Sequence, residues 1–366
     1  MDINLLKQEL RQVTDPRRPW GNKRHKLVDI LMIGLCSTLS AGVDFVDMED
    51  FGNDRIEWLK GFLELPNGIP DSDTFRRVFE RVCPVELKRC LTAWLDTQRE
   101  GQRLVNVDGK TIRGSASDKH GAYHVVSAWV EEARLTLGEI KTAEKSNEIK
   151  AIPQLLELID VEGDVVSIDA MGCQTDIASA IRKKKADYLL AVKGNQGTLF
   201  EDISHYFDNL EGLAHMRWQG KFEKDHGRIE RREVTVAPAG WLACAMNWQD
   251  IQTIIRYTCS REKDDVKTVS NRYYISSLNT TPEHFAKLLR GHWSIENHLH
   301  WALDVIFRED ASRARKDNSP LNLNVLRKIA IPILHACKVG RLSAQKKMLK
   351  AARNPAFLDR LLFDRM

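Results

Sequence analysis

Several features are missing from this sequence of 366 residues, and each absence excludes a class of protein. No run approaches the roughly 18 apolar residues of a membrane-spanning helix, so no membrane partner is expected. The opening MDINLLKQELRQ lacks the basic-then-apolar order of a secretory signal. The seven cysteines form no Cys-x-x-Cys pair, which argues against a zinc ribbon or a disulfide framework. The sequence therefore predicts a reduced, cytoplasmic protein.

Positive charge is unevenly distributed along the chain. Residues 311–366 hold 13 Lys and Arg against three Asp, a balance of +10, whereas the whole chain has a net charge of only +4. The preceding residues therefore sum to about −6. A basic tail on a nearly neutral body indicates a polyanionic partner such as nucleic acid, and the alternative is a solvated basic helix pair.

Residues 1–100 have mainly helical patterns and are expected to form a helical N-terminal domain. The apolar run KLVDILMIGLCSTLSAG (26–42) predicts a buried helix. Gly and Pro then interrupt LPNGIPDSDTFRRVFERV (65–82), where a new helix follows an acidic cap. This piece is either a DNA contact of the helix-turn-helix type or an ordinary packing helix.

From residue 101 the pattern changes to strands separated by turns and helices. Short β-type runs occupy 103–109, 122–130, 134–141, 164–170 and 187–192, and helical patterns occupy 147–159, 173–185 and 198–209. Three strands that can be antiparallel are thus followed by two β–α–β units. The sequence predicts an α/β fold, a mixed five-stranded sheet with flanking helices, whose first part spans 101–214.

Residues 215–280 form a β-rich insertion, and 281–366 complete the domain. From Pro282 one long helix is expected, with Leu288, Ile295, Leu299, Ala302 and Ile306 as its buried stripe. A neighbouring stripe holds His292, Glu296, His300 and Leu303. Trp293 and Trp301 are expected in the core rather than as base-stacking surfaces.

Three acids can meet in this fold. Asp108 ends the first strand and Asp169 ends the fourth, and these two strands are neighbours in a sheet of this order. The last helix can bring Glu296 to the same edge. Clustered carboxylates repel unless cations neutralise them, and hard oxygen ligands select Mg²⁺ or Mn²⁺. Each acid alone has a simpler interpretation: Asp108–Gly109 as a turn, Asp169 as a helix cap, Glu296 as a surface residue.

Several motifs together resemble a known family. VDGKTIRGS (107–115), TAEKSNEI (142–149), SIDAMGCQ (167–174), YLLAVKGNQ (188–196), HGRIERR (226–232) and RGHWSIENHLHWALDV (290–305) are similar to the H-repeat-associated proteins, insertion-sequence transposases of the DDE superfamily. The resemblance implies a ribonuclease H-like catalytic domain with a β-strand insertion. It also implies that Asp108, Asp169 and Glu296 hold two Mg²⁺ ions.

The last helix departs from the pattern of related DDE transposases, which place a Tyr, an Arg and a Lys at fixed spacing around the Glu. Here the Tyr position holds Leu289, the Arg position His292 and the Lys position Leu303. Histidine still donates hydrogen bonds to phosphate, although it is charged only part of the time near neutral pH. The DNA-end contacts of this chain are therefore expected to differ from those of its relatives.

Other polar residues are candidates for DNA contact, with a structural alternative for each. A strand–helix turn or a solvated charge run would also account for them, and His292, Glu296 and His300 could instead bind zinc at their helical spacing. Asn147 and Glu148 either support the site or begin a helix. The predicted DNA contacts are Lys193, Asn195, Gln196, His226, Arg228, His292, Arg313 and Arg315.

The function that the sequence predicts is metal-dependent DNA cleavage and strand transfer by a transposase. Its partners would be the double-stranded DNA of the element ends and the target, and two ends require a homodimer on DNA. Two ions about 3.5–4 Å apart would bind the attacking and leaving oxygens of the phosphodiester. The alternatives are an inactive DNA-binding remnant of a mobile element and a nuclease without strand transfer.

Overall fold

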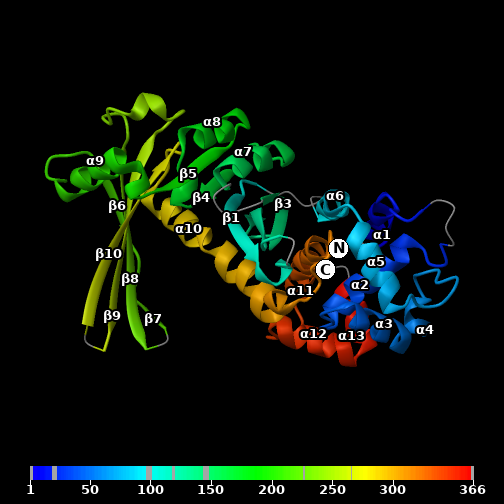
Figure 1. The fold of residues 1–366 in the computed structure, drawn as a ribbon. Coiled ribbons are helices and arrows are strands. Elements are labelled where there is room, and N and C mark those ends of the chain that lie inside the picture. Colours follow the sequence, from blue (N-terminus) through cyan, green and yellow to red (C-terminus); the bar gives the residue numbers. More distant parts are fainter. Residues whose placement is uncertain are drawn as a thin grey trace.

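A computed structural model describes residues 3–18, 23–95, 101–117, 120–142, 148–225, 227–264 and 266–363. A large mixed sheet with packed helices lies beside a helical body (Figure 1). The helices are α1 (Ile3–Leu10), α2 (Leu27–Leu39), α3 (Phe45–Asp54), α4 (Ile56–Leu59), α5 (Ser72–Arg81), α6 (Pro84–Leu95), α7 (Glu148–Leu158), α8 (Thr175–Lys183), α9 (Gly197–Asp208), α10 (Pro282–His292), α11 (Ser319–Ala336), α12 (Ala344–Arg353) and α13 (Pro355–Phe363). The strands are β1 (Leu104–Ile112), β2 (Tyr123–Val130), β3 (Leu135–Thr142), β4 (Val165–Ile168), β5 (Asp187–Val192), β6 (Met216–Gln219), β7 (Glu223–Asp225), β8 (Arg228–Pro238), β9 (Thr253–Lys263) and β10 (Val266–Ser276).

The five predicted strands are present and follow the order β3-β2-β1-β4-β5. β1 is antiparallel to β2 and parallel to β4, and β4 is parallel to β5. All four residues of β4 are buried, as its continuous apolar sequence predicts for a strand covered on both faces. The predicted neighbourhood of the first and fourth strands is confirmed.

The strands of 215–280 extend this same sheet. β10 pairs antiparallel with the outer edge of β5, and β9, β8 and β6 continue the order while β7 pairs with β8. The sheet thus has ten strands where the sequence predicts five. The pairing of β10 satisfies the edge of β5, whose backbone groups would otherwise lack partners. The far halves of β8, β9 and β10 project from the body as a ribbon (Figure 1).

Residues on the two faces of the central strands pack against different helices. Val105, Val166 and Leu190 share a hydrophobic core with residues of α7, α8 and α9. Leu104 and Val165 share another with α10. Because side chains alternate along a strand, Asn106 and Asp108 project to the same face as Leu104, the face that α10 crosses.

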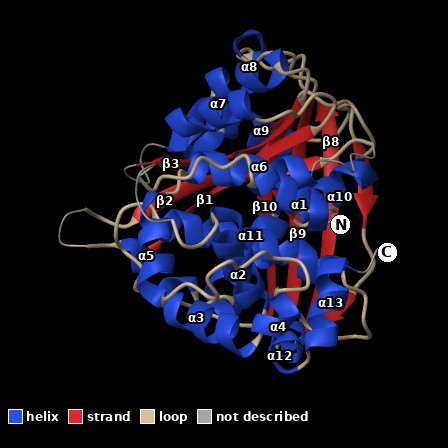
Figure 2. Cartoon of the chain, turned by 90° about the vertical axis from the view of Figure 1, so that its right-hand side faces the viewer, coloured by secondary structure: helices blue, strands red, loops and turns tan. Residues whose placement is uncertain are grey.

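The first helices and the last helices form one body. Figures 1 and 2 show α2, α3 and α5 beside α11, α12 and α13, and residues of both groups share a single hydrophobic core. Every residue of α2 is buried, which explains its apolar sequence. A Cβ placed on Gly34 would lie 3.1 Å from Phe79 and 3.2 Å from Leu326, so α2 packs closely on both α5 and α11. The predicted helical character of 1–100 is confirmed for its described residues.

The helix expected from Pro282 onward is not one regular α-helix. α10 ends at His292, and π-helical stretches follow over Ile295–His300 and Ala302–Ile306. A π-helical turn holds more residues than an α-helical turn, so side chains drift around the axis. Leu303, predicted on the stripe of Glu296, is fully buried, whereas Glu296 is exposed. That part of the periodicity prediction is wrong.

The structure also bears on the cysteines and on membrane-spanning helices. All seven cysteines are free thiols. In the described part of the chain, no helix has both the length and the apolar composition to cross a bilayer.

Candidate active site on β1 and β4

Asp108 and Asp169 occupy matching places on neighbouring strands. Val107 pairs with Ile168 in the parallel register, so the two aspartates are the next residues along β1 and after β4. The prediction that Asp108 ends its strand is wrong, because β1 continues to Ile112 and pairs Gly109 with Val126. The interpretation of Asp108–Gly109 as a turn is therefore wrong.

The surroundings of Asp108 raise its pKa. Its Oδ1 accepts a hydrogen bond of 2.8 Å from the Gly109 N–H, and its Oδ2 lies 3.6 Å from Nδ1 of His300. Burial is the largest effect and raises the pKa to about 7, against the lowering effect of the Gly109 hydrogen bond, with further increases from the charges of Asp169, Glu296 and Glu148. The carboxylates that the sequence predicts together thus influence one another electrostatically.

Asp169 caps the turn that follows β4. Its Oδ1 accepts from the backbone N–H groups of Met171 at 3.1 Å and Gly172 at 3.4 Å. The same turn is braced from the next strand–helix connection, where Asn195 donates to the Ala170 carbonyl and Gln196 to the Cys173 carbonyl. The capping interpretation is confirmed, and it occupies one of the two carboxylate oxygens.

Glu296 is exposed on the first π-helical stretch, and three contacts hold this segment against the sheet. Buried Asn106 donates from Nδ2 to the Gly291 carbonyl and to Ser294 Oγ, both at 3.0 Å. Ser167 Oγ and His292 Nδ1 lie 2.8 Å apart. A Cβ on Gly291 would lie 2.5 Å from Leu104, so glycine permits this close approach of helix to strand.

Two histidines of this segment are neutral at physiological pH. Burial lowers the pKa of His292 to about 4, with Asp169 opposing and Arg272 adding to the effect. Burial also lowers the pKa of His300 to about 3, assisted by the charges of Lys328 and Lys110. His292 therefore acts here as a hydrogen-bonded link between helix and β4.

The donor chemistry of the acids suits a divalent cation. The charged side chains that raise the pKa of Asp108 are all carboxylates, and carboxylate oxygens are hard donors of the kind that bind Mg²⁺ or Mn²⁺. Within the described ranges, no three His, Cys, Asp or Glu side chains are grouped closely enough to hold a metal. Neither the three acids nor the alternative set of His292, Glu296 and His300 is a preformed metal site.

A buried histidine–glutamate pair lies beside Asp108, and the sequence analysis did not predict it. His124 Nε2 and Glu148 Oε1 lie 2.6 Å apart, and His124 Nδ1 lies 2.9 Å from Thr111 Oγ1. Both members of the pair are buried. Glu148 begins α7, so its interpretation as a helix start is confirmed, whereas Asn147 lies outside the described residues. A signal was available in the sequence, since His124 is a polar residue in a mainly apolar run, on a strand that pairs with β1.

The remaining predicted contacts lie in different places. Lys193 is exposed at the start of the 194–196 turn. Arg228 lies on β8, 2.9 Å from Glu230, and His226 falls outside the described residues. Arg313 is exposed, and Arg315 donates from Nε to the Gly114 carbonyl.

The expectation that both tryptophans of this region are core residues is wrong. Trp293 is 38% exposed and Trp301 is 52% exposed. The Arg272 guanidinium lies 4.6 Å from the Trp293 ring, in a cation–π contact.

Comparison with known proteins defines the class of this protein as a DDE-type transposase. The family described as "Transposase DDE domain" matches residues 99–331, and "DDE_Tnp_1-associated" matches residues 7–95. The chain belongs to the Transposase DDE domain family. It is 39% identical to "Putative transposase YncI" of Escherichia coli O157:H7, across 99% of this chain and 95% of that protein. It is 37% identical to "H repeat-associated putative transposase YhhI" of Escherichia coli K12, across 99% and 98%.

These relatives confirm the resemblance to H-repeat-associated transposases. Among solved structures, a chain of the "piggyBac transposase synaptic complex with hairpin DNA" aligns with all of this chain and 82% of its own. That alignment has a TM-score of 0.47 and 10% identity, so it identifies no individual residue.

Proposed function

We propose that this protein is a DNA transposase that cuts the ends of an insertion sequence and joins them to target DNA. The observation that carries the proposal is the register of β1 with β4. It places Asp108 and Asp169 side by side, on the sheet face crossed by the helix that precedes Glu296. The order β3-β2-β1-β4-β5 supports a ribonuclease H-like catalytic core within the larger sheet.

Asp108, Asp169 and Glu296 would hold the divalent ions. When bound, two Mg²⁺ ions supply a nucleophile at neutral pH and stabilise the leaving 3′-oxygen of the cut strand. The Gly109 N–H orients the Asp108 carboxylate, and the cap on Asp169 leaves its second oxygen for the site. Asn106 and the Ser167–His292 bond set the distance of the Glu296 segment from these two strands. Asp108 must lose its proton for cation binding.

The partner would be double-stranded DNA, at both the element ends and the target. Lys193, Arg313 and Arg315 would contact phosphates, and the basic tail would add affinity that falls as salt rises. Joining two ends calls for two copies of the chain on DNA. The proposed segments of the chain are a helical N-terminal segment (1–100), the first part of the catalytic domain (101–214), the β-rich insertion (215–280) and the last part of the catalytic domain (281–366).

The deciding experiment is cleavage of DNA that carries the sequence flanking this gene, with Mg²⁺ or Mn²⁺. Asp169→Asn should abolish cutting and retain the fold, whereas exposed Asp208→Asn on α9 should cut normally. Normal cutting by Asp169→Asn would refute the assignment. DNA binding without cutting by the wild type would favour an inactive remnant, and cutting without joined products would favour a nuclease.

A further inference from the structure

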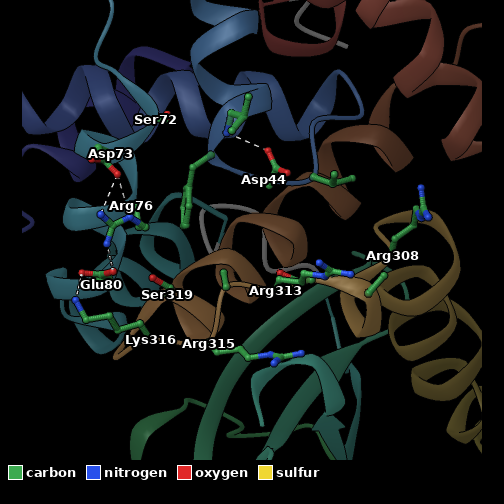
Figure 3. A pocket seen from close by; sticks show the side chains of 16 residues that line it. Asp44, Ser72, Asp73, Arg76, Glu80, Arg308, Arg313, Arg315, Lys316 and Ser319 are labelled. Atoms are coloured by element: carbon green, nitrogen blue, oxygen red, sulfur yellow. Dashed lines mark hydrogen bonds and ion pairs between the residues drawn. The ribbon is translucent and has the colours of Figure 1, made fainter. Parts of the chain in front are cut away.

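A pocket separates the helical body from the segment that follows the Glu296 region (Figure 3). Its volume is about 820 Å³. One wall is the start of α3 and most of α5, and the other is the segment 308–319. The lining residues are Val43, Asp44, Phe45, Val46, Ser72, Asp73, Arg76, Glu80, Arg308, Ala311, Ser312, Arg313, Ala314, Arg315, Lys316 and Ser319.

The acids of this pocket already have partners. Arg76 is 2.9 Å from both Asp73 and Glu80, and Lys316 is 2.9 Å from Glu80. The side chain of Asp44 accepts backbone N–H groups at the start of α3. Figure 3 shows the ion-paired residues gathered on one side of the pocket. The negative charge is therefore largely neutralised within the protein.

Two arginines on the other wall of the pocket, the segment 308–319, are less neutralised within the described part of the chain. Arg308 and Arg313 are exposed. Arg308 has no ion pair or side-chain hydrogen bond with any residue that the structure describes, and Arg313 has one long ion pair, 3.7 Å from Asp310. Among the described residues, the Arg315 side chain has one hydrogen bond, from its Nε to the Gly114 carbonyl at 3.2 Å. The pocket has five cations against three acids, so its balance is positive. Guanidinium groups in this state are suited to phosphate oxygens.

The segment that carries these arginines is anchored in place. Glu309 is fully buried and bonded to Asn324 at 2.8 Å and Arg327 at 3.2 Å. A Cβ on Gly114 would lie 2.5 Å from the Ser312 carbonyl, so this backbone packs tightly on the end of β1. Arg308 itself has a left-handed backbone, with φ of 52°. Anchoring lowers the entropic cost of binding a ligand.

The segment that lines the pocket also contacts the strand of the candidate active site. Lys110, two residues after Asp108, is 2.6 Å from Asp304 and 3.9 Å from Asp310. Those acids lie just before and within the segment that lines the pocket. These ion pairs link the arginine-bearing segment to β1, the strand that carries Asp108.

We propose that this pocket binds the sugar–phosphate backbone of duplex DNA next to the position of cutting, with Arg308 and Arg313 as the phosphate contacts. The proposal rests on the proposed function for the placement of the cut, but not for binding itself. The helical body and the catalytic sheet would then hold the same DNA segment between them. Arg308 was not among the contacts that the sequence predicts.

The test is duplex binding by fluorescence anisotropy without divalent metal, over a series of KCl concentrations. Arg308→Asn combined with Arg313→Ala removes both charges, and asparagine tolerates the left-handed backbone. Each phosphate contact contributes about 0.9 to the slope of log K against log salt, so the slope should fall by roughly 1.8. Arg308→Lys with Arg313→Lys should keep most of the slope. A matched control, Lys183→Ala with Lys287→Ala, removes two exposed charges on α8 and α10.

Two results would overturn the proposal: an unchanged slope in the Arg308/Arg313 variant, or an equal loss in the control. Circular dichroism of each variant confirms the fold. Phosphate ethylation interference then locates the lost contacts, which should flank the cut. Because binding is measured without metal, a failure of cleavage in the wild type would refute the proposed function and leave this test intact.

Discussion

His124 and Glu148 form a buried hydrogen bond of 2.6 Å directly against the backbone of Gly109, the residue after Asp108. The pair thus supports the strand on the face that carries α7. Any displacement of Gly109 would also move the N–H that orients the Asp108 carboxylate. The support for this acid therefore comes from β2 and α7 as well as from β1.

Gly109→Ala should reduce both stability and cleavage. The new Cβ would lie 2.3 Å from His124 Nε2 and 2.5 Å from Glu148 Oε1. Overpacking of this kind costs about 1–3 kcal/mol, and relief requires a shift of the strand or the pair. Urea unfolding and the cleavage rate measure the two effects. Gly240→Ala is the control because nothing lies within 4 Å of its Cβ. Wild-type cleavage by Gly109→Ala would show that the pair does not position Asp108.

Asn106→Ala should weaken the attachment of the Glu296 segment. The substitution removes both hydrogen bonds from Nδ2 and leaves the partly buried Gly291 carbonyl and the buried Ser294 hydroxyl without this donor. Unsatisfied buried groups cost about 1–3 kcal/mol each. Ser294→Ala removes only one of the bonds and should have the smaller effect on urea unfolding and on cleavage. Equal effects of the two variants would contradict this account.

The stability of the metal-free protein should fall as pH rises from about 4 to 7. The pKa of Asp108 is about 7 in the folded protein against an ordinary value of 3.8. In that window the unfolded chain has lost a proton that the folded chain keeps, so unfolding is favoured as pH rises, and the effect levels off above pH 7. At 1.36 kcal/mol per unit, the total is at most about 4 kcal/mol.

Denaturant unfolding in EDTA at pH 4 to 8 measures this effect. Asp108→Asn should lose the decline, and Mg²⁺ should stabilise the wild type above pH 7 more than the variant. The same decline in both proteins would assign it to another group.

Arg327→Ala should be strongly destabilising, because it leaves the fully buried Glu309 with one partner fewer. Breaking a buried ion pair costs about 3–5 kcal/mol. Arg76→Ala should cost less, because its pair with exposed Asp73 is worth about 0–1 kcal/mol and buried Glu80 keeps its pair with Lys316. Thermal unfolding compares the two. The Arg327 variant should also bind DNA less tightly if the segment 308–316 loses its anchor.

Local patterns were enough to predict much of this protein. The alternation and apolarity of five short runs predicted β1 to β5 and the helices between them, because these signals depend on neighbours in the chain. The β-rich character of 215–280 was predictable for the same reason. The motifs around Asp108, Asp169 and Glu296 predicted the family, which the comparisons confirm.

Only the tertiary structure decided which distant segments meet. The pairing of β10 with β5 depends on an exposed strand edge that no local pattern records. The π-helical stretches around Glu296 follow the contact of Asn106 with Gly291, and their wider turns changed the regular spacing predicted for this segment. The shared core of α2, α5 and α11 joins residues nearly 300 positions apart along the chain, as Gly34 and Leu326 show. The sequence determined most helices and strands and the identity of the three acids. Long-range packing decided how far apart the acids lie, because burial and pairing energies depend on partners that are remote in the chain.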